Sequence, residues 1–341
     1  MINTQVNVQD LENEFYSKPY YLSYSGLNKM LFSPKLFYNH YILKQKEDKI
    51  ESYLIDGKVI HNLLLDDGRF DQNFVLLPSS LPTGNTRIVI DKVHSILKAM
   101  NPQPTTEYTL TDLSNEIIEI LKEINLHQSL KTDEQRIAKI ITEETNNYFT
   151  FLKTKGNRDL IDEETLNRCK ESVVYLKNNN TVNDLLGFTR SEFANTQIYN
   201  EIELNMESSV LLRPFGLKGI VDNIYINFDD KTIFINDLKT TGKTIADFEE
   251  TINFYNYNMQ AAIYKQLVSF NFKDLIDKEW TVVFNFIVID KYNQVYCFKV
   301  SDDTMGIWQL NLFLKINEVQ WHYANKNYVL PYKFAHSQII L

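Results

Sequence analysis

Cysteine is scarce in this chain, which has only Cys169 and Cys297 among its 341 residues. Two cysteines cannot build a disulfide framework, and no pair has C-x-x-C spacing. Four-cysteine zinc sites and cysteine-ligated iron–sulfur clusters are therefore excluded within the chain. Glycine is also rare, at 10 residues, beside abundant Asn, Lys and Ile. That bias indicates AT-rich codon usage rather than a function.

Long apolar runs are absent too. No stretch approaches the roughly 18 apolar residues needed to span a bilayer. The first residues, MINTQVNVQDLENEF, have neither the basic cluster nor the apolar stretch of a signal peptide. We therefore expect a cytoplasmic protein. Because 44% of the residues are hydrophobic and 13% are aromatic, the chain can bury a core, which excludes wholesale disorder.

Basic residues are outnumbered by acidic ones, 35 to 44, which gives a net charge of −9. This balance argues against a protein that binds nucleic acid mainly by bulk electrostatic attraction. It is compatible with an enzyme that has a local basic groove, and acidic residues around a cation site would shift the total in the same direction.

The first half of the chain has a helical pattern from about residue 23 to 155. Ser25 precedes the apolar-periodic run GLNKMLF, and Ser33 followed by Pro34 is typical of a helix start for KLFYNHYIL. Further helices are predicted at 51–66, 88–100, 112–124, 133–154 and 163–178.

The second half changes to alternation of apolar and polar residues, which predicts strands at 197–206, 217–228, 231–239, 280–290 and 295–301. Helices are predicted at 254–269 and 304–323. Asp229-Asp230 predicts a hairpin turn between the second and third strands. The fold class expected is α/β, with a mixed central sheet flanked by helices. No linker is evident, so we predict a single domain over 1–341, with a mainly helical part at 1–190 and the sheet core and C-terminal helix at 191–341.

Two carboxylates and a lysine form the centre of the predicted site. Asp237 and Lys239 are two apart in one strand and therefore share a face. Asp222 lies in the partner strand of the hairpin, where it can approach Asp237. Carboxylates among apolar neighbours are costly to bury unless a cation binds them, and Mg²⁺ prefers oxygen ligands. The alternative is an ordinary salt-bridged strand end, because D-x-K is common by chance.

Further candidates lie on neighbouring elements. Glu201 and Glu203 share the parity of the preceding strand, so either can supply another acidic ligand or belong to a solvated strand face. His61 is either a core histidine or a metal ligand. Gln260 and Tyr264 are at i and i+4 of a predicted helix, a spacing that serves packing as well as recognition.

The segment 240–244, TTGKT, ends like a phosphate-binding P-loop. That motif needs a glycine five positions before Gly242, where this chain has Asp237. We therefore expect no ATP binding.

Aromatic and basic residues are interleaved around the predicted site. The rings either stack on unpaired bases or pack in the core, and packing is expected for most of them. The aromatic residues are Phe215, Tyr225, Phe254, Tyr255 and Tyr257, and the basic ones are Lys218, Lys231, Lys239, Lys243, Arg213 and Lys265.

Taken in order, these motifs resemble the PD-(D/E)xK nuclease superfamily. The matching elements are G-x-x-x-H (Gly57, His61), the acidic strand (Glu201, Glu203), G-x-x-D (Gly219, Asp222), D-x-K-T (Asp237, Lys239, Thr240) and Q-x-x-x-Y (Gln260, Tyr264). The set is most similar to the phage-type exonucleases that include RecE and the lambda exonuclease, and to the RecB/AddB nuclease domain. YLSYSGLNKMLFSPKLFYNHY also resembles the opening helices of the RecE-like group. The resemblance covers residues 20–330.

The resemblance implies a Mg²⁺-dependent deoxyribonuclease that resects linear duplex DNA 5′→3′ in phage-type recombination or repair, in the cytoplasm of a bacterial or phage-infected cell. Its partners would be DNA ends, a single-strand annealing protein and other copies of the chain in a ring. The catalytic residues implied are Asp222, Asp237, Lys239 and Glu203, with Glu203 preferred over Glu201. One or two Mg²⁺ or Mn²⁺ ions would be bound by His61, Glu203, Asp222, Asp237 and the carbonyl of Leu238. The site and the DNA would be supported by Gln260, Tyr264, Thr240 and Lys243.

Two alternatives stay open. An endonuclease or a flap or single-strand nuclease would use the same fold and would cut a closed circle. A catalytically silent DNA-binding accessory module is the other, although an intact Asp222, Asp237 and Lys239 set counts against it.

Overall fold

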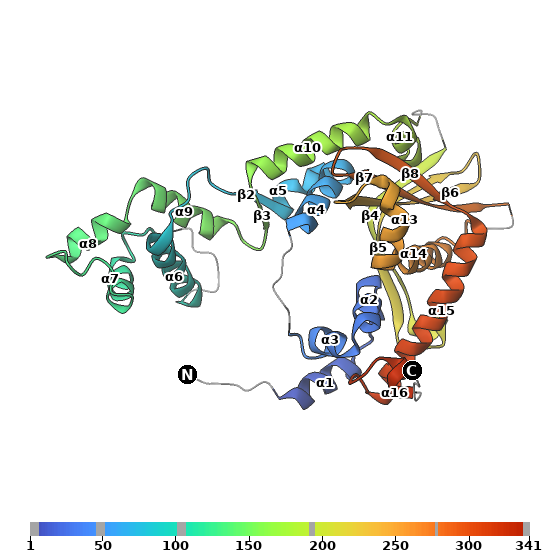
Figure 1. Cartoon of the computed structure of the whole chain (residues 1–341), viewed down its shortest axis with the longest axis horizontal. Coiled ribbons are helices and arrows are strands. Elements are labelled where there is room, and N and C mark those ends of the chain that lie inside the picture. Colours follow the sequence, from blue (N-terminus) through green and yellow to red (C-terminus); the bar gives the residue numbers. More distant parts are fainter. Residues whose placement is uncertain (1–6, 46–51, 101–106, 191–194, 277–278, 337–341) are drawn as a thin grey trace. The chain divides into compact units, whose positions relative to one another are not determined.

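A computed structural model describes residues 7–45, 52–100, 107–190, 195–276 and 279–336 (Figure 1). The chain divides into two compact units, one made of Met1–Asp67 with Arg168–Leu341 and the other of Gly68–Asn167. Each unit has its own buried apolar cluster. The predicted single domain over 1–341 stays a prediction.

The first unit is built on a six-stranded mixed sheet, which confirms the expected α/β class with a central mixed sheet flanked by helices. The order is β1-β5-β6-β7-β8, and β4 pairs with β5. The strands are β1 (Tyr21–Leu22), β4 (Thr196–Met206), β5 (Gly216–Asn227), β6 (Thr232–Thr241), β7 (Thr281–Asp290) and β8 (Val295–Val300). β1 pairs in parallel with β5, and β7 pairs in parallel with β6. The remaining pairs of this sheet are antiparallel.

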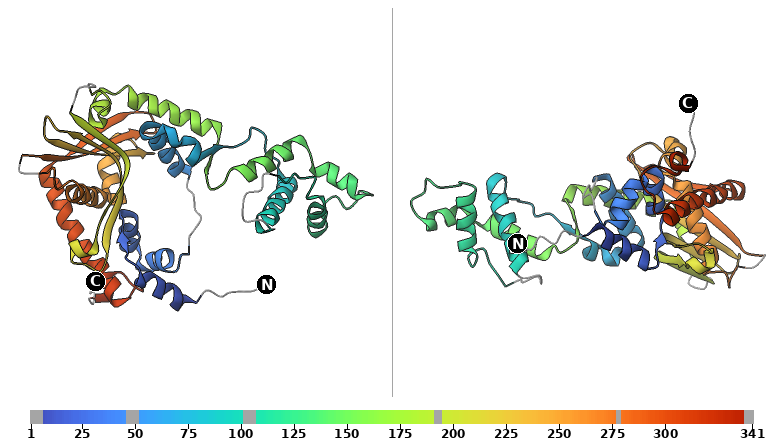
Figure 2. Two further views of the ribbon diagram at one scale, coloured as in Figure 1. Left: turned by 180° about the vertical axis from the view of Figure 1, so that it is seen from behind. Right: turned by 90° about the horizontal axis from the view of Figure 1, so that it is seen from below.

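Helices cover this sheet, as Figures 1 and 2 show. α14 contacts β4 to β7 and is itself packed against α15, while α4 and α11 contact β5 and β6. The helices are α1 (Val8–Ser17), α2 (Tyr24–Phe32), α3 (Pro34–Phe37), the π-helical η1 (Tyr38–Ile42), α4 (Ser52–Leu65), α11 (Asn180–Leu186), α12 (Ser208–Leu211), the 3₁₀ turn η3 (Ile245–Asp247), α13 (Phe248–Tyr255), α14 (Tyr257–Asn271), α15 (Asp302–Asn325) and α16 (Tyr332–His336).

Local signals account for most of these boundaries. Ser33 caps α3 through its side chain and Pro34 is the first residue of the helix, as predicted. The cap of α2 is Ser23 rather than the predicted Ser25. The helix predicted at 254–269 is two helices, α13 and α14, because Asn256 between them adopts a left-handed backbone with φ of 57°. That break fixes where the residues on either side of it point.

The second unit is mainly helical. It contains α5 (Phe70–Asn73), α6 (Gly84–Met100), α7 (Ser114–Glu123), α8 (Asp133–Ile140), α9 (Glu143–Thr154) and a parallel pair, β2 (Phe74–Leu76) with β3 (Asp159–Ile161). The 3₁₀ turn η2 (Asp67–Arg69) and α10 (Glu163–Lys177) contribute residues to both units. The helix predicted at 133–154 is split because Thr142 starts a new helix with a capping box.

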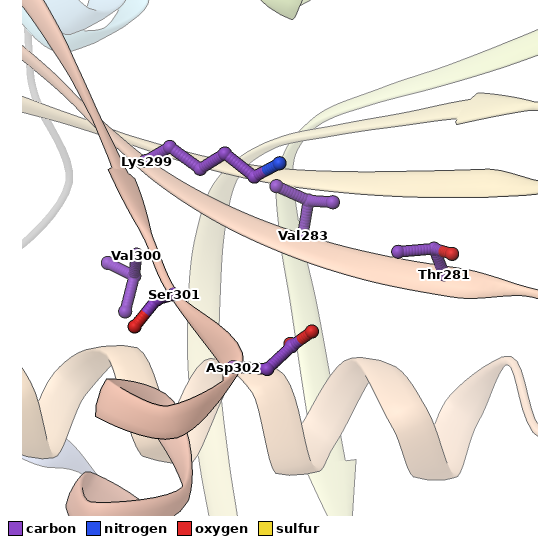
Figure 3. Close-up of a pocket in the computed structure, with 6 residues that line it drawn as sticks. All are labelled: Thr281, Val283, Lys299, Val300, Ser301 and Asp302. Atoms are coloured by element: carbon purple, nitrogen blue, oxygen red, sulfur yellow. The ribbon is translucent and has the colours of Figure 1, made fainter.

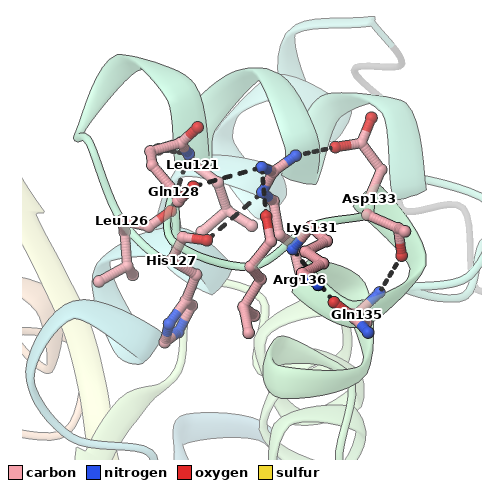
Figure 4. A network of polar contacts seen from close by, with 10 residues as sticks. Leu121, Leu126, His127, Gln128, Lys131, Asp133, Gln135 and Arg136 are labelled. Atoms are coloured by element: carbon pink, nitrogen blue, oxygen red, sulfur yellow. Dashed lines mark hydrogen bonds and ion pairs between the residues drawn. The ribbon is translucent and has the colours of Figure 1, made fainter.

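Arg136 of α8 organises the loop before that helix (Figure 4). Its guanidinium donates to the carbonyl of Leu130 at 2.6 Å and to that of His127 at 3.4 Å, and it is paired with Asp133. These bonds tie the loop carbonyls to α8, and the carbonyl of His127 also accepts from the amide of Leu130 at 3.1 Å.

Within the described residues, the helices include none whose length and apolar character would let it traverse a membrane.

Candidate metal centre

The site lies where β5 and β6 part. Their ladder runs from Asn227 opposite Thr232 to Asn223 opposite Asn236 and then stops. Beyond that row β6 continues beside β7, and the start of β5 pairs with β1. The next opposed positions after the last pair are Asp222 on β5 and Asp237 on β6. The structure therefore brings these two predicted residues together where the strands separate, a place that we call the fork.

Asp222 bridges the fork with its side chain. Its Oδ2 accepts a hydrogen bond from the backbone amide of Leu238 at 2.8 Å. His61 of α4 reaches the same peptide segment, with Nε2 2.9 Å from the carbonyl oxygen of Leu238. Because a carbonyl oxygen only accepts, Nε2 carries the proton of this bond.

The other ring nitrogen of His61 faces two carboxylates. Nδ1 lies 3.5 Å from Oε1 of Glu201 and 3.7 Å from Oδ2 of Asp222. With Nε2 protonated, neutral imidazole presents a lone pair at Nδ1, and a lone pair is repelled by carboxylate oxygens unless a proton or a cation lies between them. Ligand atoms of His61, Glu201 and Asp222 all lie within 4.8 Å of one another. This is an oxygen and nitrogen donor set suited to a divalent cation.

Three carboxylate oxygens here are buried without a hydrogen-bond partner within the described residues. They are Oε1 of Glu201 and both Oδ1 and Oδ2 of Asp237, of which Oδ2 is ion-paired with Lys239. Buried polar atoms normally have a hydrogen-bond partner, so unpaired ones call for an explanation. A bound cation is a chemically suitable partner for carboxylate oxygens.

The preferred ligand Glu203 does not join this group, and the structure places Glu201 there instead. Glu201 lies opposite Asp222 and has a left-handed backbone with φ of 48°, at the one row of the ladder where β4 and β5 are unpaired. Before this kink Tyr199 packs its ring against Phe272, whereas after it Leu204 is in the core. The alternation therefore shifts by one residue at Glu201, and Glu203 is left exposed and outside the cluster.

A second set of contacts surrounds Lys239. Its Nζ lies 2.7 Å from Oδ2 of Asp237 and donates to Oε1 of Gln260 at 2.9 Å. Gln260 in turn donates to the hydroxyl of Tyr264 at 2.9 Å. The Lys239 ammonium also lies 4.5 Å from the centre of the Tyr257 ring. The predicted i, i+4 pair on α14 thus holds the lysine in place, while the role of Asp237 as a metal ligand stays a prediction.

The charges of this cluster are mismatched without a cation. Burial raises the pKa of Asp237 to about 6, although Lys239 alone would lower it. Burial also raises the pKa of Asp222, against His61 and Lys239. Burial alone would lower the pKa of His61, yet Asp222 and Glu201 outweigh it and raise that pKa. Asp222 and Asp237 therefore resist ionisation, which a bound cation would relieve.

Other predicted residues lie outside these contacts. Lys243 is exposed, and the described contact of its amide is with the hydroxyl of Thr241 at 3.1 Å. Thr240 instead fits against α4, since a Cβ added to Gly57 would lie 3.0 Å from its Oγ1. Gly57 thus lets α4 approach β6 closely enough for His61 to reach the fork.

The sequence did not reveal a row of asparagine side chains, which lies one residue pair along the ladder from Asp222 and Asp237. Asn223 donates to Asn200 at 2.8 Å, Asn236 donates to Asn223 at 2.8 Å, and Asn285 donates to Asn236 at 2.9 Å. The row crosses β4, β5, β6 and β7. Asn236 also donates to the carbonyl of Leu185 on α11, and Asn200 to that of α4 residue Leu65. The signal was an Asn in each of four strands, which individually is typical of turns.

A pocket of about 340 Å³ lies elsewhere in the first unit, at the start of α15 (Figure 3). Lys299 of β8 and Asp302 of α15 line it, and Asp302 lies 3.4 Å from Lys265. It contains none of the cluster residues at the fork.

Comparison with known proteins adds little to this geometry. No protein-family model matches the chain, and no curated protein matches it. Among solved structures, the chain is similar to a crystal structure from Eubacterium rectale of a protein provisionally described as an exonuclease. The two are 12% identical with a TM-score of 0.43, over 93% of this chain and 86% of that one.

Proposed function

We propose that this chain is a metal-dependent deoxyribonuclease that hydrolyses the phosphodiester bonds of linear double-stranded DNA from an end. The observation that carries the proposal is the set of buried carboxylate oxygens without a hydrogen-bond partner, on Glu201 and Asp237, beside a histidine and a fixed lysine. Buried carboxylates where two strands separate do not stabilise the fold by themselves. These carboxylates are suited to binding a divalent cation, and the lysine beside them is suited to binding a phosphate.

The donor set fits Mg²⁺ or Mn²⁺. His61 Nδ1 and the carboxylates of Glu201 and Asp222 would hold the ion, with Asp237 adjacent. Carboxylate oxygens suit both ions, and a single imidazole nitrogen suits Mn²⁺. When bound, such an ion polarises the phosphodiester and makes water a better nucleophile.

The residues of the chain have separate roles in this scheme. The hydrogen bond from His61 to the Leu238 carbonyl fixes the tautomer, so that Nδ1 stays free to bind. Asp237 and Gln260 hold the Lys239 ammonium, which would orient the attacking water and stabilise negative charge on the phosphate. Tyr264 keeps Gln260 in that position.

The finer features follow from the PD-(D/E)xK resemblance and belong to the same proposal. They are 5′→3′ polarity, a role in phage-type recombination, handover of the 3′ strand to an annealing protein, and a ring of several copies.

The test is digestion of 5′-labelled linear duplex DNA with Mg²⁺, beside a closed circle, chelated samples and an Asp237→Ala variant. We expect only the linear DNA to shorten, and neither the variant nor the chelated enzyme to act. Cutting of the circle would overturn the end-dependent mechanism and favour an endonuclease. Failure to cut either substrate with Mg²⁺ or Mn²⁺ would overturn nuclease function in favour of a silent DNA-binding module.

A further inference from the structure

A row of aromatic rings leads from Lys239 to the protein surface. Lys239 Nζ lies 4.5 Å from the centre of the Tyr257 ring. The rings of Tyr257 and Tyr255 are stacked, with centroids 5.4 Å apart and planes 22° apart. The Phe254 ring meets Tyr255 edge-on at 4.9 Å. Exposure rises along the row, from half-buried Tyr257 to 39% at Tyr255 and 75% at Phe254.

The outer end of this row is held by α2. The backbone carbonyl of Tyr255 accepts hydrogen bonds from the hydroxyl of Tyr24 and from Nδ2 of Asn28, the latter at 3.0 Å. Asn256 donates to Oδ1 of Asn28 at 2.6 Å. Because the left-handed residue Asn256 is held in this way, the last turn of α13 presents Phe254 from a fixed backbone.

Core packing does not account for Phe254. Tyr257, in contrast, packs between Phe248 and Phe286. A phenylalanine with three quarters of its surface in water gains little from burial, although single exposed apolar residues are common. Its continuity with a stacked ring and with the lysine of the site distinguishes it from a scattered surface residue.

We propose that Phe254 and Tyr255 stack on unpaired bases of the strand whose phosphate lies at Asp237 and Lys239. This inference rests on the proposed nuclease function and specifies its substrate as a strand that is single or locally opened. Bases inside a duplex have both faces covered by their neighbours, so a protein ring can stack only on a terminal or unpaired base. Stacking on bases behind the terminal pair therefore requires the duplex end to open before its strand enters the site.

The experiment compares the wild type with Phe254→Ala, Phe254→Leu and Phe254→Trp. The matched control is Tyr292→Ala, since Tyr292 is another exposed aromatic, at 63%, in the turn after β7. Substrates are a single strand, the blunt duplex containing it and the same duplex with a short frayed end. Base stacking is read separately from hydrolysis by the fluorescence of 2-aminopurine at the strand end, and folding is checked by thermal unfolding.

We expect Phe254→Ala and Phe254→Leu to raise KM for the single strand and the frayed duplex about 5- to 150-fold, the range measured for one base–aromatic stack. kcat should change much less. Wild type, Phe254→Trp and Tyr292→Ala should all quench 2-aminopurine, and the Ala and Leu variants should not.

Two results distinguish failure of the stacking proposal from failure of the proposed nuclease function. Hydrolysis by Phe254→Ala with unchanged KM and unchanged quenching would overturn the stacking proposal and leave the nuclease function standing. If the wild type hydrolyses no substrate, the nuclease function falls, and loss of quenching in Phe254→Ala but not in Tyr292→Ala would still support base stacking at this row.

Discussion

The carboxylate of Asp222 accepts a hydrogen bond from the backbone amide of Leu238 at 2.8 Å, across the row where β5 and β6 separate. A side chain thus takes the place of the next ladder bond. The carbonyl of the same Leu238 accepts from His61, so both polar groups of one residue are held by predicted metal ligands. Backbone geometry and ligand geometry are therefore coupled at the fork, and a change in either should affect both.

The two glutamates of β4 provide a matched pair for testing the ligand set. We expect Glu201→Gln to weaken Mn²⁺ binding by about 10-fold or more, since removal of a carboxylate from a metal site has at least the effect of losing a supporting contact. Glu203→Gln should leave binding unchanged because Glu203 is exposed and lies outside the cluster of His61, Glu201 and Asp222. Isothermal titration calorimetry measures both. Equal effects would contradict the shift of alternation at Glu201.

Stability without metal should depend on pH through Asp237. Its pKa in the folded protein, about 6, lies above the ordinary 3.8, so its protonated form is favoured by folding. This contribution is complete below about pH 3.8 and is lost as pH rises through 6. In chelator at pH 7.5, Asp237→Asn should therefore be more stable than wild type by on the order of 3 kcal/mol.

Urea unfolding at several pH values checks this. The advantage of Asp237→Asn should shrink as pH falls from 7.5 to 5, and it should reverse when Mn²⁺ is added to both proteins. A constant difference across pH would show that the substitution acts by packing rather than by ionisation.

The asparagine row should be a large contributor to stability. Asn236→Ala removes one member that donates to Asn223 and Leu185 and accepts from Asn285, leaving buried polar groups unpaired. We expect a loss of about 3 kcal/mol. Asn205→Ala, at an exposed position of β4, should change stability by less than about 0.5 kcal/mol. Similar effects of the two substitutions in urea unfolding would refute the role of the row.

The centre of the site was predictable because strand geometry is regular. The turn at Asp229-Asp230 fixes the register of β5 and β6, and this register sets Asp222 opposite Asp237. Period-two spacing likewise brings Lys239 to Asp237. These inferences need only the alternation of a strand and the position of one turn.

The missed features depend on departures from regularity. A left-handed backbone at Glu201, which is not a glycine, has no sequence signature, so parity alone could not separate it from Glu203. The row of asparagines needs the registers of four strands at once. Pairing of β6 with β7 crosses two helices, which local patterns do not specify.

The approach of α14 to β5 should be sensitive to a single methyl group at Gly219. A Cβ there would lie 2.8 Å from Cε1 of Tyr264, which must then move and take Gln260 with it. We expect Gly219→Ala to cost about 1–3 kcal/mol and to lower kcat more than it weakens metal binding, because Lys239 loses its Gln260 contact. Gly306→Ala on α15 is the control, since its added Cβ would meet nothing within 4 Å. It should be neutral or stabilising by up to about 1 kcal/mol. Thermal unfolding, Mn²⁺ titration and kcat of the three proteins decide the matter, and a Gly219→Ala variant with wild-type kcat would show that Tyr264 does not position the lysine.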